Sequence, residues 1–128
     1  MIILLDTSTN ICKLNMIDGN DDKLVQWQAD RNLARDLLKF IVDNLELEGK
    51  KIKDISGIGI FRGPGSFTGL RIGMTVANVI AHELKIPIIG ETGENWQEKI
   101  KKRLLANEND KIVLPFYGAE ANITKPRK

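Results

Sequence analysis

Apolar and polar residues alternate along the N-terminal part of the chain in a way that predicts strands. A short apolar run at 2–5 predicts a buried strand, and alternation over 12–16 and 24–28 predicts two half-exposed strands. An Asp-Gly-Asn-Asp turn at 18–21 separates the last two. Residues 2–28 are therefore expected to form a three-stranded meander.

The remainder of the chain is expected to alternate helices with strands. Apolar residues recur at helical spacing over 31–47 and 67–84, and a basic helix is expected at 94–106. Further strands are expected at 56–61, 86–89 and 111–114. Three consecutive strands followed by helix, strand, helix and strand predict one mixed α/β domain.

A glycine-rich loop connects the strand expected at 56–61 to the helix that follows it. Residues 63–73 read Gly-Pro-Gly-Ser-Phe-Thr-Gly-Leu-Arg-Ile-Gly. Pro64 fixes one backbone angle, whereas Gly63, Gly65 and Gly69 allow a positive φ or the close approach of another backbone. We interpret these four residues as the structural part of the loop.

Two interpretations of this loop stay open. Ser66 or Thr68 can cap the helix, and loop N–H groups beside a helix N-terminus favour an anion. A tight strand-to-helix connection without a ligand explains the same residues. The two common phosphate loops are excluded by spacing, because no lysine follows Gly69 and the glycines lie two and then four residues apart.

Several segments resemble the TsaB (YeaZ/Gcp-like) family of accessory subunits in bacterial tRNA threonylcarbamoyladenosine biosynthesis. The loop at 63–73 carries most of the resemblance. Residues 1–9 resemble the family's first strand and Asp-Thr turn, and 84–90, Leu-Lys-Ile-Pro-Ile-Ile-Gly, resembles the strand after its second helix. The segment Pro115-Phe-Tyr117 is more weakly similar to a terminal Pro-x-Tyr element. The resemblance covers roughly residues 1–95.

This resemblance implies a single domain of the actin/Hsp70/sugar-kinase superfamily, which is ribonuclease H-like. We expect that domain over 1–114 and a basic tail over 115–128, in a short form without the family's second domain. Members of the superfamily hold ATP in a cleft between two domains. Half a cleft leaves phosphates in water, where electrostatic stabilisation is weak. We therefore expect no enzyme activity, no required cofactor and no binding of ATP or ADP by the isolated chain.

Four polar residues are the candidates for any anion or nucleotide contact: Asp6, Thr7, Ser66 and Thr68. Asp6 would meet the metal of a nucleotide, but a carboxylate that forms a turn is the interpretation we favour. No metal site is expected, because His82 is the only histidine and the chain has one cysteine. A Ser66–His82 pair would be separated by roughly 20 Å along one helix, which excludes a serine hydrolase.

Both predicted helices carry more apolar surface than one sheet contact requires. In 67–84 the polar residues form one narrow stripe, and small residues recur at intervals of four. We interpret the surplus as a surface for another subunit, although two helices packed on each other explain part of it. Burial of such a surface contributes about 25 cal/mol per Å². The predicted interface residues are Leu33, Ala34, Leu37, Leu38, Ile41, Leu70, Gly73, Met74, Ala77 and Ala81.

The resemblance implies that this surface binds and activates a TsaD-like catalytic subunit. That subunit transfers threonylcarbamoyl to the adenosine next to the anticodon of tRNA. TsaE is a further implied partner, and a homodimer is expected in isolation. The helix opens with Arg31-Asn-Leu-Ala, where the family commonly has Arg-x-His-Ser. Two alternatives stay open: a minimal nucleotide-binding ATPase domain completed by self-association, and a homodimeric scaffold with a partner unrelated to tRNA.

Composition adds little to this picture. The 128 residues are 42% hydrophobic and 28% charged with a net charge of +2, which is typical of one core and weak nucleic-acid attraction. Basic clusters at 99–103 and 125–128 are interpreted as solvated surface, so direct tRNA contact is not expected. The absence of a long apolar stretch and the single cysteine lead us to expect a cytoplasmic protein without membrane contact.

Overall fold

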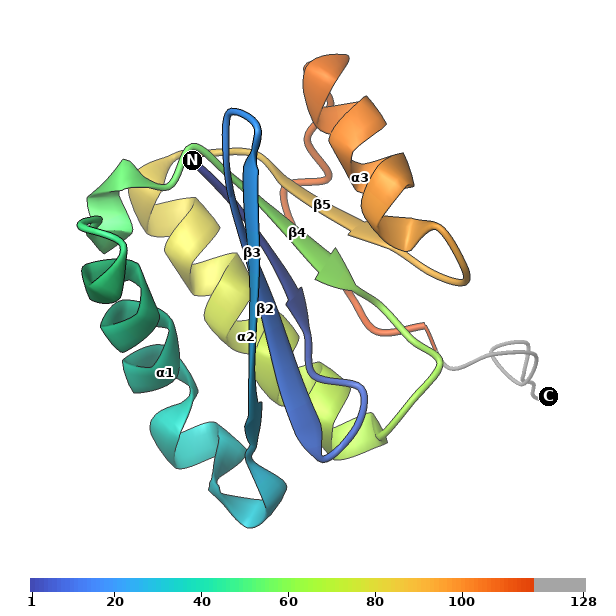
Figure 1. The fold of residues 1–128 in the computed structure, drawn as a ribbon. Helices are drawn as coiled ribbons and strands as arrows, with labels where there is room; N and C mark the ends of the chain where they lie inside the picture. Colours follow the sequence, from blue (N-terminus) through green and yellow to red (C-terminus); the bar gives the residue numbers. More distant parts are fainter. Residues whose placement is uncertain (117–128) are drawn as a thin grey trace, which may run out of the picture.

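The computed structural model describes residues 1–116, which form a five-stranded mixed sheet with helices on both faces (Figure 1). The strands are β1 (Ile2–Asp6), β2 (Ile11–Asp18), β3 (Asp21–Gln28), β4 (Gly57–Phe61) and β5 (Ile88–Glu91). Their order is β3-β2-β1-β4-β5, with antiparallel β1–β2 and β2–β3 pairs and parallel β1–β4 and β4–β5 pairs. The predicted mixed α/β class and the N-terminal meander are confirmed.

Three α-helices cover the sheet: α1 (Leu33–Leu47), α2 (Phe67–Leu84) and α3 (Trp96–Leu105). Helices α1 and α2 lie side by side on one face, and α3 lies on the other face against β4 and β5 (Figure 1). Two short 3-10 turns, Asp30–Asn32 and Ile52–Asp54, flank α1. The helix expected at 31–47 begins two residues later, because Asp30 takes a positive φ of 48° and a 3-10 turn intervenes.

The bounds of α2 agree with the sequence because local signals fix both of its ends. The Ser66 hydroxyl accepts a hydrogen bond from the Gly69 N–H at 3.3 Å, which caps the first turn. At the other end Lys85 takes a left-handed conformation, and Pro87 follows two residues later.

Most buried apolar side chains lie between the sheet and the α1–α2 layer. The largest fully buried members of this cluster are Ile3, Leu5, Leu14, Leu37, Ile41, Leu45, Ile58, Ile60, Leu70 and Ile88. A smaller cluster of Leu4, Ile89 and Ile100 lies under α3. A Cβ atom at Gly59 would lie 2.5 Å from Ile100 Cγ2, so this glycine lets α3 approach the sheet closely.

The strand expected at 111–114 is wrong. Both backbone groups of Val113 bond to one side chain: the Asn78 amide N–H donates to the Val113 carbonyl, and the Val113 N–H donates to Asn78 Oδ1, each at 2.9 Å. The segment therefore runs beside α2 without joining the strand ladder. Tyr117 and the basic residues at 125–128 lie outside the described part of the chain.

Two further features concern the described helices. Trp96 at the start of α3 packs against Phe61 with ring centroids 5.4 Å apart, so this tryptophan anchors its helix to β4. Among the described residues, no helix combines the length and the apolar character needed to cross a bilayer.

Candidate functional site

The turn after β1 is built by the Asp6 carboxylate. Its Oδ1 atom accepts hydrogen bonds from the Ser8 N–H at 2.9 Å and from the Ser8 hydroxyl at 2.6 Å. The Ser8 carbonyl in turn accepts a hydrogen bond from the Ser66 N–H at 2.8 Å. The carboxylate thus holds the turn, and the turn is tied to the glycine-rich loop.

Thr7 connects this turn to the first turn of α2. Its side chain is fully buried, and its hydroxyl donates to the Gly69 carbonyl at 2.7 Å. A Cβ atom at Gly73 would overlap Thr7 Oγ1, and one at Gly69 would overlap the Thr7 carbonyl oxygen. The hydroxyl of this predicted anion ligand therefore faces the helix, not a solvent-filled site.

Close approach explains most of the glycines in the loop. Gly63 has a positive φ of 118°, but Gly65 and Gly69 do not. A Cβ at Gly65 would lie 2.5 Å from Ser8 Cβ. Glycines at 65, 69 and 73 thus form a surface without side chains onto which the Asp6–Ser8 turn packs. The spacing of four could have revealed this surface, although the contact across it is not visible in the sequence.

The remaining two candidate anion ligands lie on the outside of the loop. Ser66 and Thr68 are both exposed, and the Ser66 hydroxyl serves as the helix cap described above. Of the four predicted residues, Asp6 and Thr7 are therefore engaged within the strand-to-helix connection, and Ser66 and Thr68 lie on its outer side. An anion at this connection stays a prediction.

Most residues predicted for the partner interface lie in the core of the chain. Only Ala34 and Leu38 are exposed, and the exposed fraction of Leu38 is 51%. The others are buried between the helices and the sheet: Leu33, Leu37, Ile41, Leu70, Gly73, Met74, Ala77 and Ala81. Those eight residues are already covered within the chain, so the structure corrects the expectation that they line an outer surface.

The contacts of α2 explain why it carries more apolar surface than packing against one sheet would require. Its three flanks face the sheet, α1 and the segment that contains Val113. A helix covered on three sides needs apolar residues around most of its circumference. The small residues at 73 and 77 face inward, and the one at 73 serves contact with Thr7.

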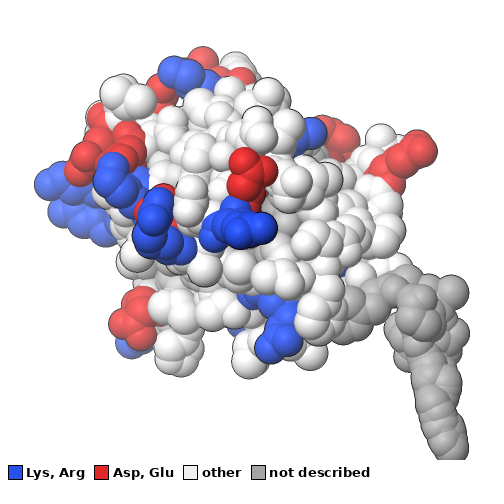
Figure 2. Space-filling view, turned by 90° about the horizontal axis from the view of Figure 1, so that it is seen from below, with Lys and Arg blue, Asp and Glu red and all other residues white. Residues whose placement is uncertain are grey.

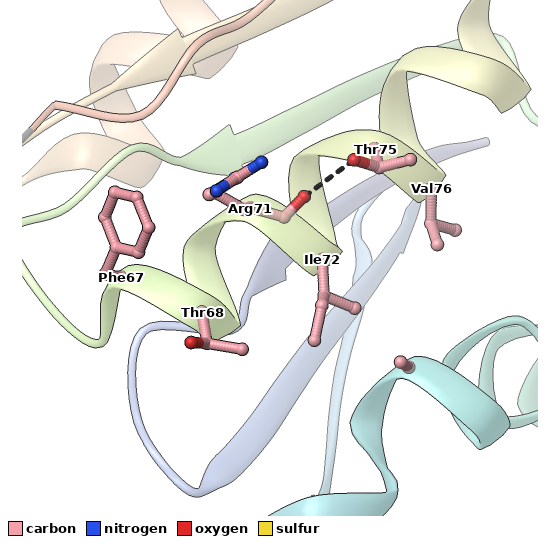
Figure 3. Close-up of a pocket in the computed structure, with 7 residues that line it drawn as sticks. Phe67, Thr68, Arg71, Ile72, Thr75 and Val76 are labelled. Atoms are coloured by element: carbon pink, nitrogen blue, oxygen red, sulfur yellow. Dashed lines mark hydrogen bonds between the residues drawn. The ribbon is translucent and has the colours of Figure 1, made fainter.

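A groove of about 390 Å³ nonetheless remains open between α1 and α2 (Figure 3). From α2, the side chains of Thr68, Ile72 and Val76 point toward α1 in this view. The groove is lined by Ala34, Phe67, Thr68, Arg71, Ile72, Thr75 and Val76. Apart from Ala34, none of these was among the predicted interface residues, although 68, 72 and 76 form one stripe at a spacing of four.

Two polar side chains that line the groove, Thr75 and Arg71, contact other residues of the groove lining. The Thr75 hydroxyl donates to the Arg71 carbonyl at 2.8 Å, and the Arg71 guanidinium lies 5.2 Å from the ring centroid of Phe67. Phe67 is 52% exposed. The groove therefore presents an apolar floor and an aromatic rim with one cation.

Charged side chains of both signs are mixed on the face of the molecule that is seen from below (Figure 2). Lys and Arg are most crowded at the left of this view, and further charges of both signs lie at its centre and toward its right edge, between uncharged areas. Four of the five charges on α1 neutralise one another in the pairs Arg35–Asp36 and Lys39–Asp43. Such a surface suits a protein partner better than a polyanion.

The basic residues of α3 are largely used within the chain. Arg103 pairs with Asp110, Glu108 and Glu91, and the hydrogen bonds that its guanidinium donates, first to Asp110 and then to Glu108, raise its pKa further above the usual range. Lys101 lies 3.3 Å from Glu98, and Lys99 donates to a backbone carbonyl at residue 92. In residues 1–116 there is no cluster of three or more His, Cys, Asp or Glu side chains suited to a metal ion.

Comparison with known proteins gives a consistent result. A family model described as "TsaD: tRNA N6-adenosine threonylcarbamoyltransferase" matches residues 26–92. The chain is 32% identical over 89 residues to the tRNA threonylcarbamoyladenosine biosynthesis protein TsaB of Escherichia coli, a match that covers 70% of this chain and 38% of that protein. The protein of the same name from Buchnera aphidicola subsp. Schizaphis graminum is 27% identical over 131 residues, covering 92% and 59%.

A solved structure titled "YeaZ from Pseudomonas aeruginosa" has the same fold. It superposes with a TM-score of 0.67 at 30% sequence identity, and the match covers 71% of this chain and 43% of that one. The chain thus spans less than two thirds of the length of each of these relatives.

Proposed function

The chain belongs to the TsaB/YeaZ family, and from this we propose that it is a non-catalytic subunit that binds and activates a TsaD-type catalytic subunit. The reaction would be transfer of threonylcarbamoyl to the adenosine next to the anticodon of tRNA. The observation that supports this proposal most directly is the open groove between α1 and α2, which lies beside the loop that carries the family resemblance.

The groove has the properties of a protein-binding surface. Its floor is formed by the aliphatic parts of Ile72 and Val76, and Phe67 at its rim is about half exposed. Apolar area removed from water contributes about 25 cal/mol per Å², so an apolar helix laid along the groove would gain from its burial. The ion pairs on the neighbouring face of α1 and the single cation Arg71 at the groove impose no large electrostatic cost on a partner of ordinary composition.

We propose that activation works by selective binding. A partner that exposes a complementary apolar surface in only one of its conformations would bind the groove only in that conformation. Binding then shifts the population of the partner toward that conformation in proportion to the difference in affinity. This chain needs no reactive group for such a role.

The loop geometry supports the proposal that the chain itself uses no nucleotide. The Thr7 hydroxyl is engaged by Gly69, the Ser66 hydroxyl caps the helix, and the Asp6 carboxylate holds Ser8. The Thr7 hydroxyl in particular would have to leave the Gly69 carbonyl before it could donate to a phosphate. Of the alternatives considered from the sequence, the ATPase domain is therefore less well supported than the accessory subunit.

The proposal also covers two further candidate partners, TsaE and tRNA. TsaE would join the assembly through the catalytic subunit. Direct tRNA binding is not proposed, because three of the four α3 cations, Lys99, Lys101 and Arg103, are engaged by carboxylates or backbone. Filter binding of the isolated protein to tRNA over a salt series tests this point, and sub-micromolar, salt-sensitive affinity would contradict it.

The experiment that tests the proposed function places a charge in the groove. Ala34→Arg introduces a cation at an exposed groove residue, and Leu47→Arg introduces the same charge at the far end of α1, where Leu47 is 80% exposed. Both variants are titrated against the TsaD-type subunit from the same cell, by calorimetry and by the rate of tRNA modification. We expect about tenfold weaker binding or more for Ala34→Arg and no change for Leu47→Arg.

Two results would contradict the proposal. The first is that the unmodified protein leaves the modification rate unchanged at saturating concentration. The second is equal binding by both variants, which would show that the partner does not use the groove. Circular dichroism melts of both variants establish that neither change unfolds the chain.

A further inference from the structure

The two edges of the sheet differ in whether anything covers them. At the β5 edge, the Ile88 N–H donates to Asn109 Oδ1 at 3.1 Å and the Gly90 N–H donates to Asp110 Oδ2 at 2.9 Å, so side chains replace a neighbouring strand. At the other edge, all eight residues of β3 pair with β2 in an unbroken antiparallel register. The outer side of β3 forms no backbone hydrogen bond with any part of residues 1–116. A regular strand with unpaired outward N–H and C=O groups is a template for another strand.

A second groove, of about 430 Å³, lies between β3 and α1. It is lined by Trp27 from the edge strand itself and by Asp36, Lys39, Phe40 and Asp43 from α1. Because side chains alternate between the two faces of a sheet, every second side chain of a strand added to β3 would point to the α1 side. An extended chain at this edge can therefore place a side chain in the groove.

The groove combines two aromatic rings with two carboxylates. The rings of Trp27 and Phe40 lie with their centroids 5.2 Å apart, and both side chains are half-buried against the main core. Asp36 and Asp43 are seven residues apart on α1, which places them on the same side of the helix two turns apart. Aromatic faces attract cations, and carboxylates accept charge-assisted hydrogen bonds from them. A cationic side chain is therefore the occupant that this lining fits.

The cations already present on α1 do not fill this role firmly. Lys39 Nζ lies 2.5 Å from Asp43 Oδ2, and Arg35 Nη2 lies 2.9 Å from Asp36 Oδ2. The side chains of Lys39 and Arg35 are 74% and 72% exposed, and exposed ion pairs of this kind contribute little to stability. Glu46, the third carboxylate of α1, forms no ion pair within residues 1–116. Helix α1 thus carries three carboxylates against two cations, and its two pairs can open for an incoming cation.

We infer that β3 and α1 together form a docking site for an extended segment of a partner protein, which adds a strand to the β3 edge and places an arginine side chain in the groove. Main-chain hydrogen bonds to β3 would supply affinity, and the groove would select the side chain. Arginine fits better than lysine, because its planar guanidinium can stack on an aromatic ring while it donates two hydrogen bonds to a carboxylate.

This site is separate from the groove proposed for the catalytic subunit. That groove lies between α1 and α2, and Ala34 is its one lining residue from α1. The groove described here lies between α1 and β3, and no residue lines both. The inference therefore does not depend on the proposed function.

The test uses a short synthetic peptide as the probe. An acetylated and amidated peptide, Thr-Val-Thr-Arg-Thr-Val-Thr, favours an extended chain and carries one arginine on the same face as its valines. It is titrated into the ¹⁵N-labelled full chain, and NMR follows the amides of residues 21–28 and the Trp27 indole N–H. Peptides with glutamate or glutamine in place of the arginine test the groove. Peptides N-methylated at alternate residues, in each of the two possible phases, test the main-chain pairing.

Variants of the protein test the carboxylates. Asp36→Asn combined with Asp43→Asn removes both carboxylates from the groove lining. Glu94→Gln combined with Glu98→Gln is the matched control, because it makes the same change in net charge at two exposed residues beside and within α3. Circular dichroism melts establish that both double variants are folded.

We expect the arginine peptide to shift the amides of residues 21–28 and the Trp27 indole, and to leave those of β5 unchanged. Binding should weaken about tenfold or more with the glutamate peptide, with the Asp36→Asn, Asp43→Asn variant and with one of the two N-methylated phases. The control variant should bind as the unmodified chain does. The inference is overturned if the arginine peptide shifts none of these signals at millimolar concentration. Equal binding of the arginine and glutamate peptides, or of both N-methylated phases and the parent peptide, would also overturn it.

Discussion

The Thr7 hydroxyl donates to the Gly69 carbonyl over 2.7 Å and so joins the end of β1 to the first turn of α2. Thr7 is fully buried, and Gly73 one turn further along has no side chain to separate the helix from it. The segment that resembles a phosphate-binding loop in composition is therefore a packing contact, in which the backbone of the loop and of α2 lies directly on the turn after β1.

Replacing Thr7 by valine should destabilise the protein. The substitution keeps the shape of the side chain but removes the hydrogen bond to the Gly69 carbonyl, for which we expect a loss of about 1 kcal/mol in the free energy of unfolding. Urea denaturation measures the change. Thr75→Val is a matched control, because Thr75 also donates to a helix carbonyl but is exposed, and a change within about 0.5 kcal/mol is expected there.

A methyl group at position 73 should be costly because it has no space. Gly73→Ala would force Cβ into Thr7 Oγ1, and overpacking of this kind costs about 1–3 kcal/mol. The double variant Thr7→Ala, Gly73→Ala removes the obstructing atoms, so its total loss should be smaller than the sum of the two single losses. Strictly additive losses in thermal or urea unfolding would show that the two residues do not contact one another.

Asn78 should hold the segment around Val113 against α2. Asn78→Leu removes both hydrogen bonds to Val113, and we expect the Val113 amide to exchange with solvent much faster while the amides of β1 stay protected. Hydrogen exchange followed by NMR distinguishes this local release from general unfolding. His82→Leu, an exposed substitution on the same helix, should leave the Val113 amide unchanged.

Cys12 should behave as a buried, unreactive thiol. Burial, and secondarily the Asp6 carboxylate, raises the pKa of Cys12 to about 12 from a reference of 9.0. Because only the thiolate reacts readily, labelling of the native protein by a thiol reagent at pH 8 should be far slower than labelling of the urea-unfolded chain. Fast native labelling would contradict the burial of this side chain.

The same shift predicts how stability changes in alkali. The unfolded chain loses the Cys12 proton near pH 9 and the folded chain near pH 12, so between these values the unfolded state binds fewer protons. The contribution of Cys12 is therefore fully present below about pH 9 and is lost as the pH rises toward 12. Cys12→Ala should show a shallower fall in urea stability over this range than the unmodified protein.

The sequence predicted the secondary structure well where local signals decide it. Period-two alternation identified β2, and Ser66 at one end and Lys85–Pro87 at the other defined α2. The strand expected at 111–114 was wrong because its backbone partners are the side-chain atoms of Asn78, which no local pattern indicates. Hydrogen bonding to a distant side chain competes with strand pairing only in the folded chain.

The candidate site was harder to predict for a related reason. An apolar helix face shows that a residue is buried, but it does not show whether the chain itself or a partner buries it. Leu37 and Met74 lie in the core, whereas Leu38 and Phe67 remain on the surface. The role of Gly69 likewise depends on Thr7, sixty-two residues away in the sequence.

Direct backbone contact between α2 and the turn after β1 has a mechanical consequence. Side chains usually form a compliant layer between a helix and a sheet, and they absorb small displacements by changing rotamer. At residues 65, 69 and 73 that layer is missing. If a bound partner displaces α2 from its outer side, no side chains at these three positions would absorb the displacement. The turn that contains Asp6 would therefore move with the helix, although it lies away from the bound partner.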